Sequence, residues 1–348
     1  MSVQNYKCPG CGAPIAFNPK TGGFKCEYCF SEYTEEAITA QMQQYAHQEE
    51  PAHEAADGQE TVKIYECSNC GAEVVAGDTA TATFCYYCHS PVVLSDRLTG
   101  DFKPDHIIPF KVTKKQAIKQ FLAWAGEKWF IPNDFTSLLQ QEKITGMYLP
   151  HWQADVCAQV DYHAVGTSVT EWESGDQIYT KTDTYQIDRT GTVDITDLQK
   201  LACKTIDEDL LYGINPYNEQ ESTAFSQGYL AGFFAERYTE TKEDLTPAFI
   251  DSAKESTLSA INDSTACTSF KNKKDNTAYA VAQYRQILLP SWILTYLYKE
   301  KTYVFAVNGQ TGKACGELPL NKAKAILFSA GVGLIAGALV VAGGLFIW

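Results

Sequence analysis

The chain has 348 residues, enough for two or three units of ordinary domain size, and its composition is that of a globular protein. Its 28 basic and 42 acidic residues give a net charge of -14, which repels phosphate backbones and makes nucleic acid a disfavoured partner. The 12 cysteines would suggest disulfides in a secreted protein. In a reducing cytosol they would instead be metal ligands or small buried residues.

The first 35 residues have the cysteine spacing of a zinc ribbon. Cys8 and Cys11 form a C-x2-C pair, and after 14 intervening residues Cys26 and Cys29 form a second pair. Two tight C-x2-C turns can direct four sulfur atoms at one tetrahedral ion. Between the pairs we predict two short strands, at 14–17 and 24–25, joined by a turn rich in Pro, Gly and Asn.

The arrangement repeats in residues 62–97. The second set of cysteines follows the first by 59 residues at each position: Cys67, Cys70, Cys85 and Cys88. A redox C-x-x-C pair is the competing interpretation, but such pairs occur singly near a βαβ pattern. All four positions of each site are cysteines, so we predict two structural Zn²⁺ ions that supply most of each ribbon's folding energy.

Ribbons often bind nucleic acid, so their charges are relevant. Each ribbon mixes acidic and basic residues and neither carries a basic stripe. Four aromatic residues next to the cysteines could stack on bases or contact a protein: Tyr28, Phe30, Tyr86 and Tyr87. With these charges, contact with a protein is the favoured interpretation.

Residues 36–61 connect the two ribbons. Thr34 is a good N-cap, and apolar residues at helical spacing predict a helix over 35–46. Residues 47–60 are polar and acidic and contain Pro51 and Gly58, which indicates a flexible linker.

Residues 98–322 form a predicted cytosolic domain. Thr113 and Gln116 fit a capping box that begins an amphipathic helix ending before Pro132. Strands are predicted at 156–165, 177–187, 190–198, 278–289 and 296–307, and a second helix at 246–261. An Asn-Gly turn at 308–312 indicates a hairpin over 303–318. The expected fold class is α+β, with a mainly antiparallel sheet and packed helices.

A short motif occurs twice in this domain. Residues 148–152 (YLPHW) and 288–292 (LLPSW) share an apolar-Leu-Pro-x-Trp core about 140 residues apart, and strand-like sequence follows each. The domain could therefore consist of two related halves, although few residues carry the match.

Motifs for catalysis are sparse. The sequence contains no phosphate-binding Gly-x4-Gly-Lys loop, no His-Glu-x2-His and no Gly-x-Ser-x-Gly elbow. His151 and Asp155 would share one face of a strand as a base and its orienter, but a structural role is favoured. Four isolated cysteines are interpreted as small buried residues rather than a third metal or redox site: Cys157, Cys203, Cys267 and Cys315. No small-molecule substrate is indicated, and we expect no enzyme activity.

Residues 325–348 contain no charged side chain and predict a single C-terminal transmembrane helix. Lys313, Lys322 and Lys324 precede it, which favours an inner-membrane protein whose N-terminal domains are cytosolic. Small residues recur in this helix at four-residue spacing: Ser329, Gly333 and Gly337. They could pack against another helix, or they could simply reflect the abundance of Gly and Ala in transmembrane helices.

Four features of the chain carry a resemblance to a known family: the twin ribbons, the Leu-Pro-x-Trp strands, the hairpin that begins YVFAVNGQTG at 303–312, and the apolar C-terminal segment. In these features the chain resembles the bacterial YdjG-type, or TFIIB-type zinc-ribbon, family. Only the cysteine array is sharply specific. The resemblance implies a membrane protein that acts in envelope stress with a phage-shock protein A-like protein and with a second zinc-ribbon membrane protein.

The leading hypothesis from the sequence is a membrane-anchored, non-enzymatic adaptor that binds proteins next to the lipid bilayer. The alternative is a membrane-tethered zinc-ribbon regulator that binds nucleic acid.

Overall fold

A computed structural model of the chain describes residues 3–4, 6–46, 63–67, 70, 73–76, 79–85, 90–94, 98, 103–132, 144–204, 206–298 and 301–346. The strands are β1 (Val3–Gln4), β2 (Ala16–Asn18), β3 (Gly23–Lys25), β4 (Glu32–Tyr33), β5 (Lys63–Glu66), β6 (Glu73–Ala76), β7 (Ala80–Phe84), β8 (Pro91–Leu94), β9 (His106–Ile107), β10 (Thr145–Ser174), β11 (Gln177–Leu201), β12 (Thr223–Ala224), β13 (Phe234–Glu236), β14 (Ser269–Asp275), β15 (Ala278–Tyr298), β16 (Lys301–Asn308) and β17 (Ala314–Gly316). The helices are α1 (Glu35–Ala46), α2 (Lys114–Gly126), α4 (Glu208–Gly213), α5 (Lys242–Asp263) and α6 (Lys322–Phe346), with 3₁₀ turns η3 (Glu219–Glu221) and η4 (Gln227–Leu230).

One large sheet dominates the molecule. In the described part of the chain, 12 strands join in it, with the central path β1-β8-β7-β13-β10-β15-β16-β17. Most neighbours are antiparallel, but β10–β13 and β9–β15 are parallel, so the sheet is mixed. The expected α+β class is therefore wrong, and the fold is mainly β. The fold class was predicted wrongly because segments that look like several short strands separated by loops form two uninterrupted long strands, β10 and β11.

The two Leu-Pro-x-Trp motifs meet at the centre of this sheet. Leu149 of β10 is the antiparallel partner of Leu289 of β15, so equivalent residues of the two motifs face each other across a local two-fold arrangement. The surrounding elements follow the same pattern. The first set of elements, in chain order, is β9, α2, β10 and β11, and the second set is β13, α5, β15 and β16. The short first strand of each set pairs in parallel with the long strand of the other set, β9 with β15 and β13 with β10.

Side-chain hydrogen bonds repeat in the same way. The indole N–H of Trp152 donates to the carbonyl of Glu240 at 2.9 Å, and that of Trp292 donates to the carbonyl of Val112 at 2.8 Å. Each carbonyl lies immediately before the N-cap threonine of a helix that has a complete capping box, Thr113 for α2 and Thr241 for α5. Duplication of one half-domain would account for this arrangement, and it stays a prediction.

Helix predictions based on local signals are confirmed. Helix α1 spans 35–46, and α2 begins after the Thr113 capping box. The hairpin of β16 and β17 turns at Asn308, whose side chain is buried and donates to the carbonyl of Ile214 at 3.0 Å. The predicted linker at 47–60 lies outside the described residues.

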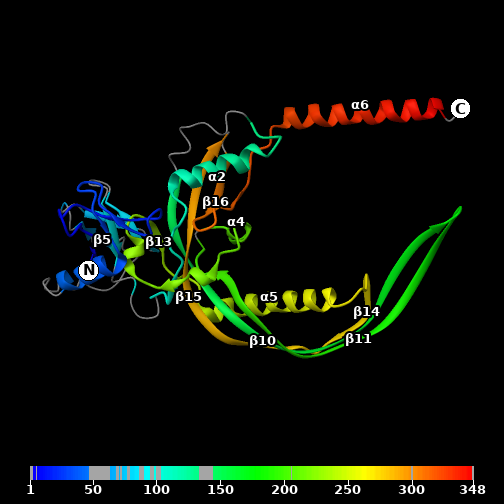
Figure 1. The fold of residues 1–348 in the computed structure, drawn as a ribbon, viewed down its shortest axis with the longest axis horizontal. Coiled ribbons are helices and arrows are strands. Elements are labelled where there is room, and N and C mark those ends of the chain that lie inside the picture. Colours follow the sequence, from blue (N-terminus) through cyan, green and yellow to red (C-terminus); the bar gives the residue numbers. More distant parts are fainter. Residues whose placement is uncertain are drawn as a thin grey trace.

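The strands β10 and β11 extend from the body as a curved arm, and α5 lies along its concave side (Figure 1). Side chains of β10 at alternate positions pack against Ile261 of α5: Ala158, Val160, Tyr162 and Ala164. This packing supports the base of the arm, while its tip continues beyond the end of α5.

Ribbon 1, comprising β2, β3, β4 and their loops, packs directly on the body. The amide N–H of Phe17 donates to the carbonyl of Ala231 at 2.9 Å, and its ring contacts Tyr229 edge to face at 5.2 Å. Phe24 is fully buried in the same core cluster. Strand β1 and the strands β7 and β8 of ribbon 2 join the large sheet, so both ribbons are fixed to the body.

The described part of the structure contradicts the predicted transmembrane anchor. None of the helices in the described part of the chain combines the length and the apolar character that a membrane crossing requires. The predictions of a transmembrane segment at 325–348 and of an inner-membrane location are therefore wrong.

The small residues predicted to pack against another helix all lie on α6. Among the described residues, no atom lies within 4 Å of the position that a Cβ would take on Gly333 or Gly337. The hydroxyl of Ser329 donates to the carbonyl of Ala325 at 2.9 Å within the helix. Helix α6 is joined to the body at its start, where Phe328 contacts Trp129 and Phe130 at ring distances of 5.8 and 5.4 Å.

Candidate metal centres

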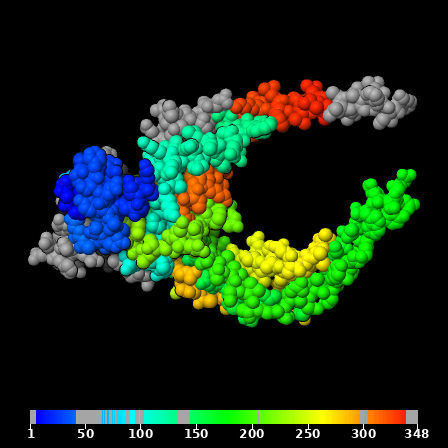
Figure 2. Space-filling view, in the orientation of Figure 1, coloured from blue at the N-terminus to red at the C-terminus, as the bar shows by residue number. Residues whose placement is uncertain are grey.

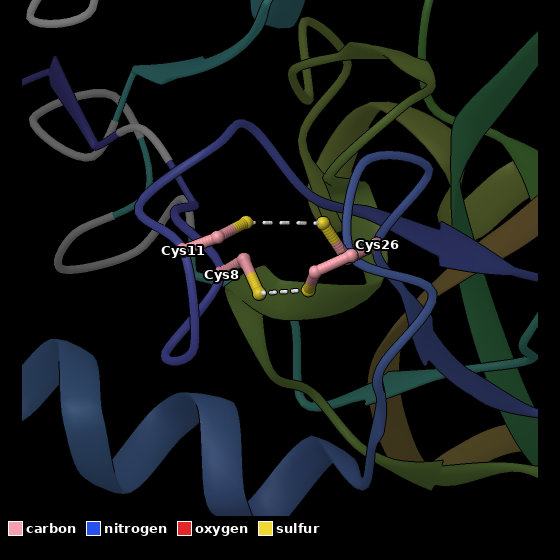
Figure 3. A group of neighbouring side chains, drawn as sticks. Cys8, Cys11 and Cys26 are labelled. Carbon is pink, nitrogen blue, oxygen red and sulfur yellow. Dashed lines mark hydrogen bonds between the residues drawn. The ribbon is translucent and has the colours of Figure 1, made fainter.

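The four cysteines of ribbon 1 converge on one point. Their sulfur atoms all lie within 4.8 Å of one another, with 3.5 Å between Cys8 and Cys29 and 3.5 Å between Cys11 and Cys26. Figure 3 shows three of these side chains directed toward one another from two separate turns. Four sulfurs around a zinc ion at 2.3 Å would be about 3.8 Å apart, so the cluster fits a tetrahedral metal ion.

Two similar turns build this site. In the first, the amide of Gly12 donates to the carbonyl of Cys8 at 2.8 Å, and Gly12 has a φ of 72°. In the second, the amide of Phe30 donates to the carbonyl of Cys26 at 3.0 Å, and Phe30 has a φ of 60°. Each turn therefore closes with a residue in the left-handed conformation, which glycine adopts freely and phenylalanine adopts at a cost.

Two residues beside the cysteines were missed in the sequence. The sulfur of Cys8 lies 3.7 Å from the hydroxyl of Tyr33, and that of Cys29 lies 3.4 Å from the hydroxyl of Ser31. Hydrogen bonds with Ser31 lower the pKa of the Cys29 thiol to about 6; the bond to the Ser31 side chain has the larger effect and the bond to its backbone has the smaller one. The thiolate is the form that binds a metal. The position of both hydroxyl-bearing residues directly after the second cysteine pair, with Tyr33 in β4, is the signal that could have identified them.

The second cluster has the same construction where it is described. The sulfur atoms of Cys67, Cys70 and Cys85 lie within 4.8 Å of one another, and those of Cys70 and Cys85 are 3.7 Å apart. The fourth predicted ligand, Cys88, lies outside the described residues. Two cysteine clusters could therefore each bind a metal ion, as the sequence predicted.

A curated relative matches almost the whole of this chain. An uncharacterized protein YdjG of Bacillus subtilis (strain 168) is 31% identical over 337 residues, which cover 95% of this chain and 94% of the relative. This chain belongs to the YdjG family. No family model matches it, and no solved structure matches it.

Half of the ribbon 1 centre in this YdjG-family chain faces solvent. Cys8 and Cys26 are buried against the body, whereas Cys11 and Cys29 are exposed. The two aromatic residues that flank Cys29 are also exposed, Tyr28 at 73% and Phe30 at 72%. We call these two rings and the turn between them the ribbon 1 tip. It presents apolar surface next to the metal site.

The structure gives His151 and Asp155 different partners. His151 is buried, and its Nδ1 lies 3.0 Å from the carbonyl oxygen of Leu149. Burial lowers the pKa of the His151 ring to about 4. Asp155 instead accepts a hydrogen bond from Arg285 at 2.9 Å. The candidate pair of a base and its orienter is therefore not brought together.

The isolated cysteines lie apart from both clusters. Cys203 is buried, and three others are half-buried: Cys157, Cys267 and Cys315. Two of them pack closely on glycines. A Cβ on Gly166 would lie 2.4 Å from the sulfur of Cys267, and one on Gly213 would lie 2.2 Å from that of Cys315. These contacts agree with a packing role for both cysteines.

Proposed function

We propose that this chain is a non-enzymatic adaptor that holds two structural Zn²⁺ ions and binds a partner protein through the ribbon 1 tip. The observation that carries this proposal is Phe30. Its backbone adopts a left-handed conformation and its ring is 72% exposed. That conformation costs a bulky residue about 1–2 kcal/mol, and an exposed ring recovers little of this cost by burial. Folding alone therefore gives no reason for phenylalanine at this position.

A metal ion in the ribbon 1 centre would make the tip rigid. With four cysteine ligands, a zinc ion has no open position for water or substrate, which is the pattern of structural sites. The ion would hold the two turns together and fix Tyr28 and Phe30 on a rigid base. Exposed aromatic residues on a rigid base are typical centres of protein interfaces.

The resemblance to the family supplies candidate partners. We propose a phage-shock protein A-like protein, or a second zinc-ribbon protein, as the partner of the ribbon 1 tip. The charges at the tip favour a protein over nucleic acid, because Glu27 is exposed there and Lys25 is already paired with Glu32 at 2.9 Å.

Isothermal titration of the zinc-loaded chain with each candidate protein would test the proposal. The tip variants Phe30→Gly and Tyr28→Ala should bind at least about tenfold more weakly, as expected for residues at the centre of an interface. Tyr212→Ala is the matched control, since Tyr212 of α4 is 76% exposed but distant in sequence from the ribbon.

Two results would count against the adaptor. The first is equal affinity of wild type and both tip variants. The second is binding of duplex DNA whose affinity falls steeply with salt, together with no binding of either protein, which would favour the nucleic-acid regulator.

A further inference from the structure

The outer edge of β11 is free along a regular stretch of strand. In the described chain β11 pairs only with β10, so the side of β11 that faces away from β10 has no strand beside it. Figures 1 and 2 show the end of the arm standing clear of the rest of the molecule. We call residues 177–187 of β11 the arm edge. Its pairing with β10 has no register shift, and all of its residues except Asp183 and Ile187 are exposed.

The body of the molecule does not require an arm of this length. Strand β10 runs 25 residues past Leu149, whereas β15 runs nine residues past Leu289, its partner in the local two-fold arrangement. The difference corresponds to roughly 50 Å of strand. In the described chain β14 pairs with β10 only as far as Thr167, so the outer arm is a two-stranded hairpin. Such a hairpin is only marginally stable in water by itself, and a further strand at its edge would stabilise it.

The sequence of the arm edge is self-complementary about Thr182. Over 179–185 it reads Tyr-Thr-Lys-Thr-Asp-Thr-Tyr. Positions at equal distance from Thr182 therefore carry lysine with aspartate (181 and 183), threonine with threonine (180 and 184) and tyrosine with tyrosine (179 and 185). In an antiparallel pair of two such edges centred on Thr182, each residue lies opposite its mirror position. The lysine of each copy then faces the aspartate of the other.

The backbone of the arm edge directs its polar groups as this pairing requires. The hairpin turns through two residues, Gly175 and Asp176, and Gln177 is the partner of Ser174. A two-residue turn closes with a hydrogen bond between the residues that flank it, so odd-numbered residues of the arm edge bond to β10 and even-numbered ones face outward. Thr182 is thus at an outward-facing position, where two copies can exchange hydrogen bonds about a two-fold axis. The outward-facing residues of the two edges would form about ten hydrogen bonds.

The ionic and aromatic pairs fall at the closer cross-strand positions. Odd-numbered residues of the two edges would be non-hydrogen-bonded partners, whose Cα atoms are about 4.5 Å apart. Lys181 already lies 2.9 Å from Asp183 of its own strand, and each would gain an opposite charge from the other copy. The rings of Tyr179 and Tyr185 are 43% and 48% exposed, and each would meet a tyrosine ring across the junction.

The arm edge lacks the features that keep strand edges from pairing. Natural edges are blocked by proline, by bulges or by charges without a match. Residues 177–187 contain no proline or glycine, are rich in strand-forming Ile, Tyr and Thr, and balance one lysine with one aspartate. In a chain of net charge -14, this neutral stretch lets two copies approach with little repulsion. The next mirror pair, Asp176 and Asp188, is acidic on both sides, so the pairing ends at Gln177 and Ile187.

We propose that two copies of this chain dimerise by antiparallel pairing of their arm edges about a two-fold axis at Thr182. The two hairpins become one four-stranded sheet in the order β10-β11-β11-β10, and the two bodies lie at opposite ends of it. Both copies use the same edge, so the interface is closed and adds no third copy. The dimer is separate from the ribbon 1 tip and does not depend on the function proposed for it.

Sedimentation equilibrium of the full zinc-loaded chain over a wide range of concentration tests the proposal. Wild type should pass from monomer to dimer and no further. Lys181→Glu and Asp183→Lys each place like charges opposite each other on both sides of the axis, and each should weaken dimerisation about tenfold or more. Two controls should dimerise as wild type does: Lys273→Glu, which makes the same charge change on β14, and Phe30→Gly at the ribbon 1 tip.

A mixture of the two charge variants tests the register. When Lys181→Glu and Asp183→Lys chains are combined, every lysine or glutamate at the junction again faces an opposite charge. The two variants should therefore form a heterodimer as tightly as wild type dimerises. Thr182→Pro removes an outward-facing N–H at the axis and leaves the bonds to β10 in place, so it should abolish the dimer. Circular dichroism and metal content would show that each variant is folded.

Three results would overturn the proposal: a wild-type chain that stays monomeric at every concentration, a dimer that Thr182→Pro leaves unchanged, or no heterodimer in the mixture. Association of wild type beyond a dimer would also contradict it, because a closed two-fold interface cannot extend.

Discussion

Replacing Phe30 with glycine should separate the stability of ribbon 1 from its binding. The change relieves a left-handed backbone strain of about 1–2 kcal/mol. Against this, glycine costs about 0.5–1 kcal/mol in backbone entropy. The loss of a ring that is about one-quarter buried costs roughly 0.7 kcal/mol. These terms nearly cancel, so the free energy of unfolding should change by less than about 1 kcal/mol.

The assay is denaturant unfolding of the zinc-loaded chain, with metal analysis of the same samples. Phe24→Ala is the contrasting variant, because Phe24 is fully buried and packs against Tyr6 and Phe17. It should lose about 3–5 kcal/mol. If Phe30→Gly loses zinc or falls by a comparable amount, the Phe30 ring is structural and its value as evidence for binding disappears.

Three further predictions follow from other contacts. Cys8→Ser and Cys85→Ser should each remove one zinc ion of two by metal analysis, because each lies in a different cluster; loss of both ions from either variant would show that the sites are not independent. Trp152→Phe and Trp292→Phe should each lower the free energy of unfolding by about 1–3 kcal/mol, since each leaves a carbonyl without its indole donor; a loss well below this at one site would mean that the two contacts are not equivalent. Hydrogen bonds to Asp188 and then Asp161 raise the pKa of His163. The stability from this pairing is therefore complete below about pH 6.5 and is lost as pH rises through the folded-state pKa. Thermal unfolding should show the gap between wild type and His163→Gln at its full size below about pH 6.5 and closing as the pH rises through the folded-state pKa; a constant gap would contradict the assignment.

Local signals in the sequence predicted local structure well. The capping box at Thr113, the cysteine spacing of ribbon 1 and the Asn-Gly hairpin each depend on a few neighbouring residues, and each is present. These features are readable because short-range hydrogen bonds and ligand geometry decide them.

Long-range structure was not readable in the same way. Gly166 looks like the end of a strand, yet β10 continues through it. Glycine is required there because a Cβ would collide with the sulfur of Cys267. The exposed outer part of the β10–β11 hairpin, residues 169–182, was missed for this reason. The two Leu-Pro-x-Trp motifs were seen, but the sequence could not show that they pair with each other at the centre of the sheet.

Predictions from composition alone were the least secure. The apolar C-terminal segment predicted a membrane span, whereas no helix in the described chain is suited to that role. Most of β11 was predicted as strand, at 177–187 and 190–198, whereas β10 extends past the predicted 156–165 at both ends, and its outer residues 169–174 lack a buried face.

The most direct test of the adaptor function is one titration series on the zinc-loaded chain, with and without a chelator. The titrants are the phage-shock protein A-like protein, the second zinc-ribbon protein and a duplex DNA. We predict that one of the two proteins binds, that the Phe30→Gly variant binds it at least about tenfold more weakly, and that chelation abolishes binding. Binding of DNA alone, or protein binding that survives loss of the metal, would contradict the proposal that zinc-ordered ribbon 1 is a protein-docking site.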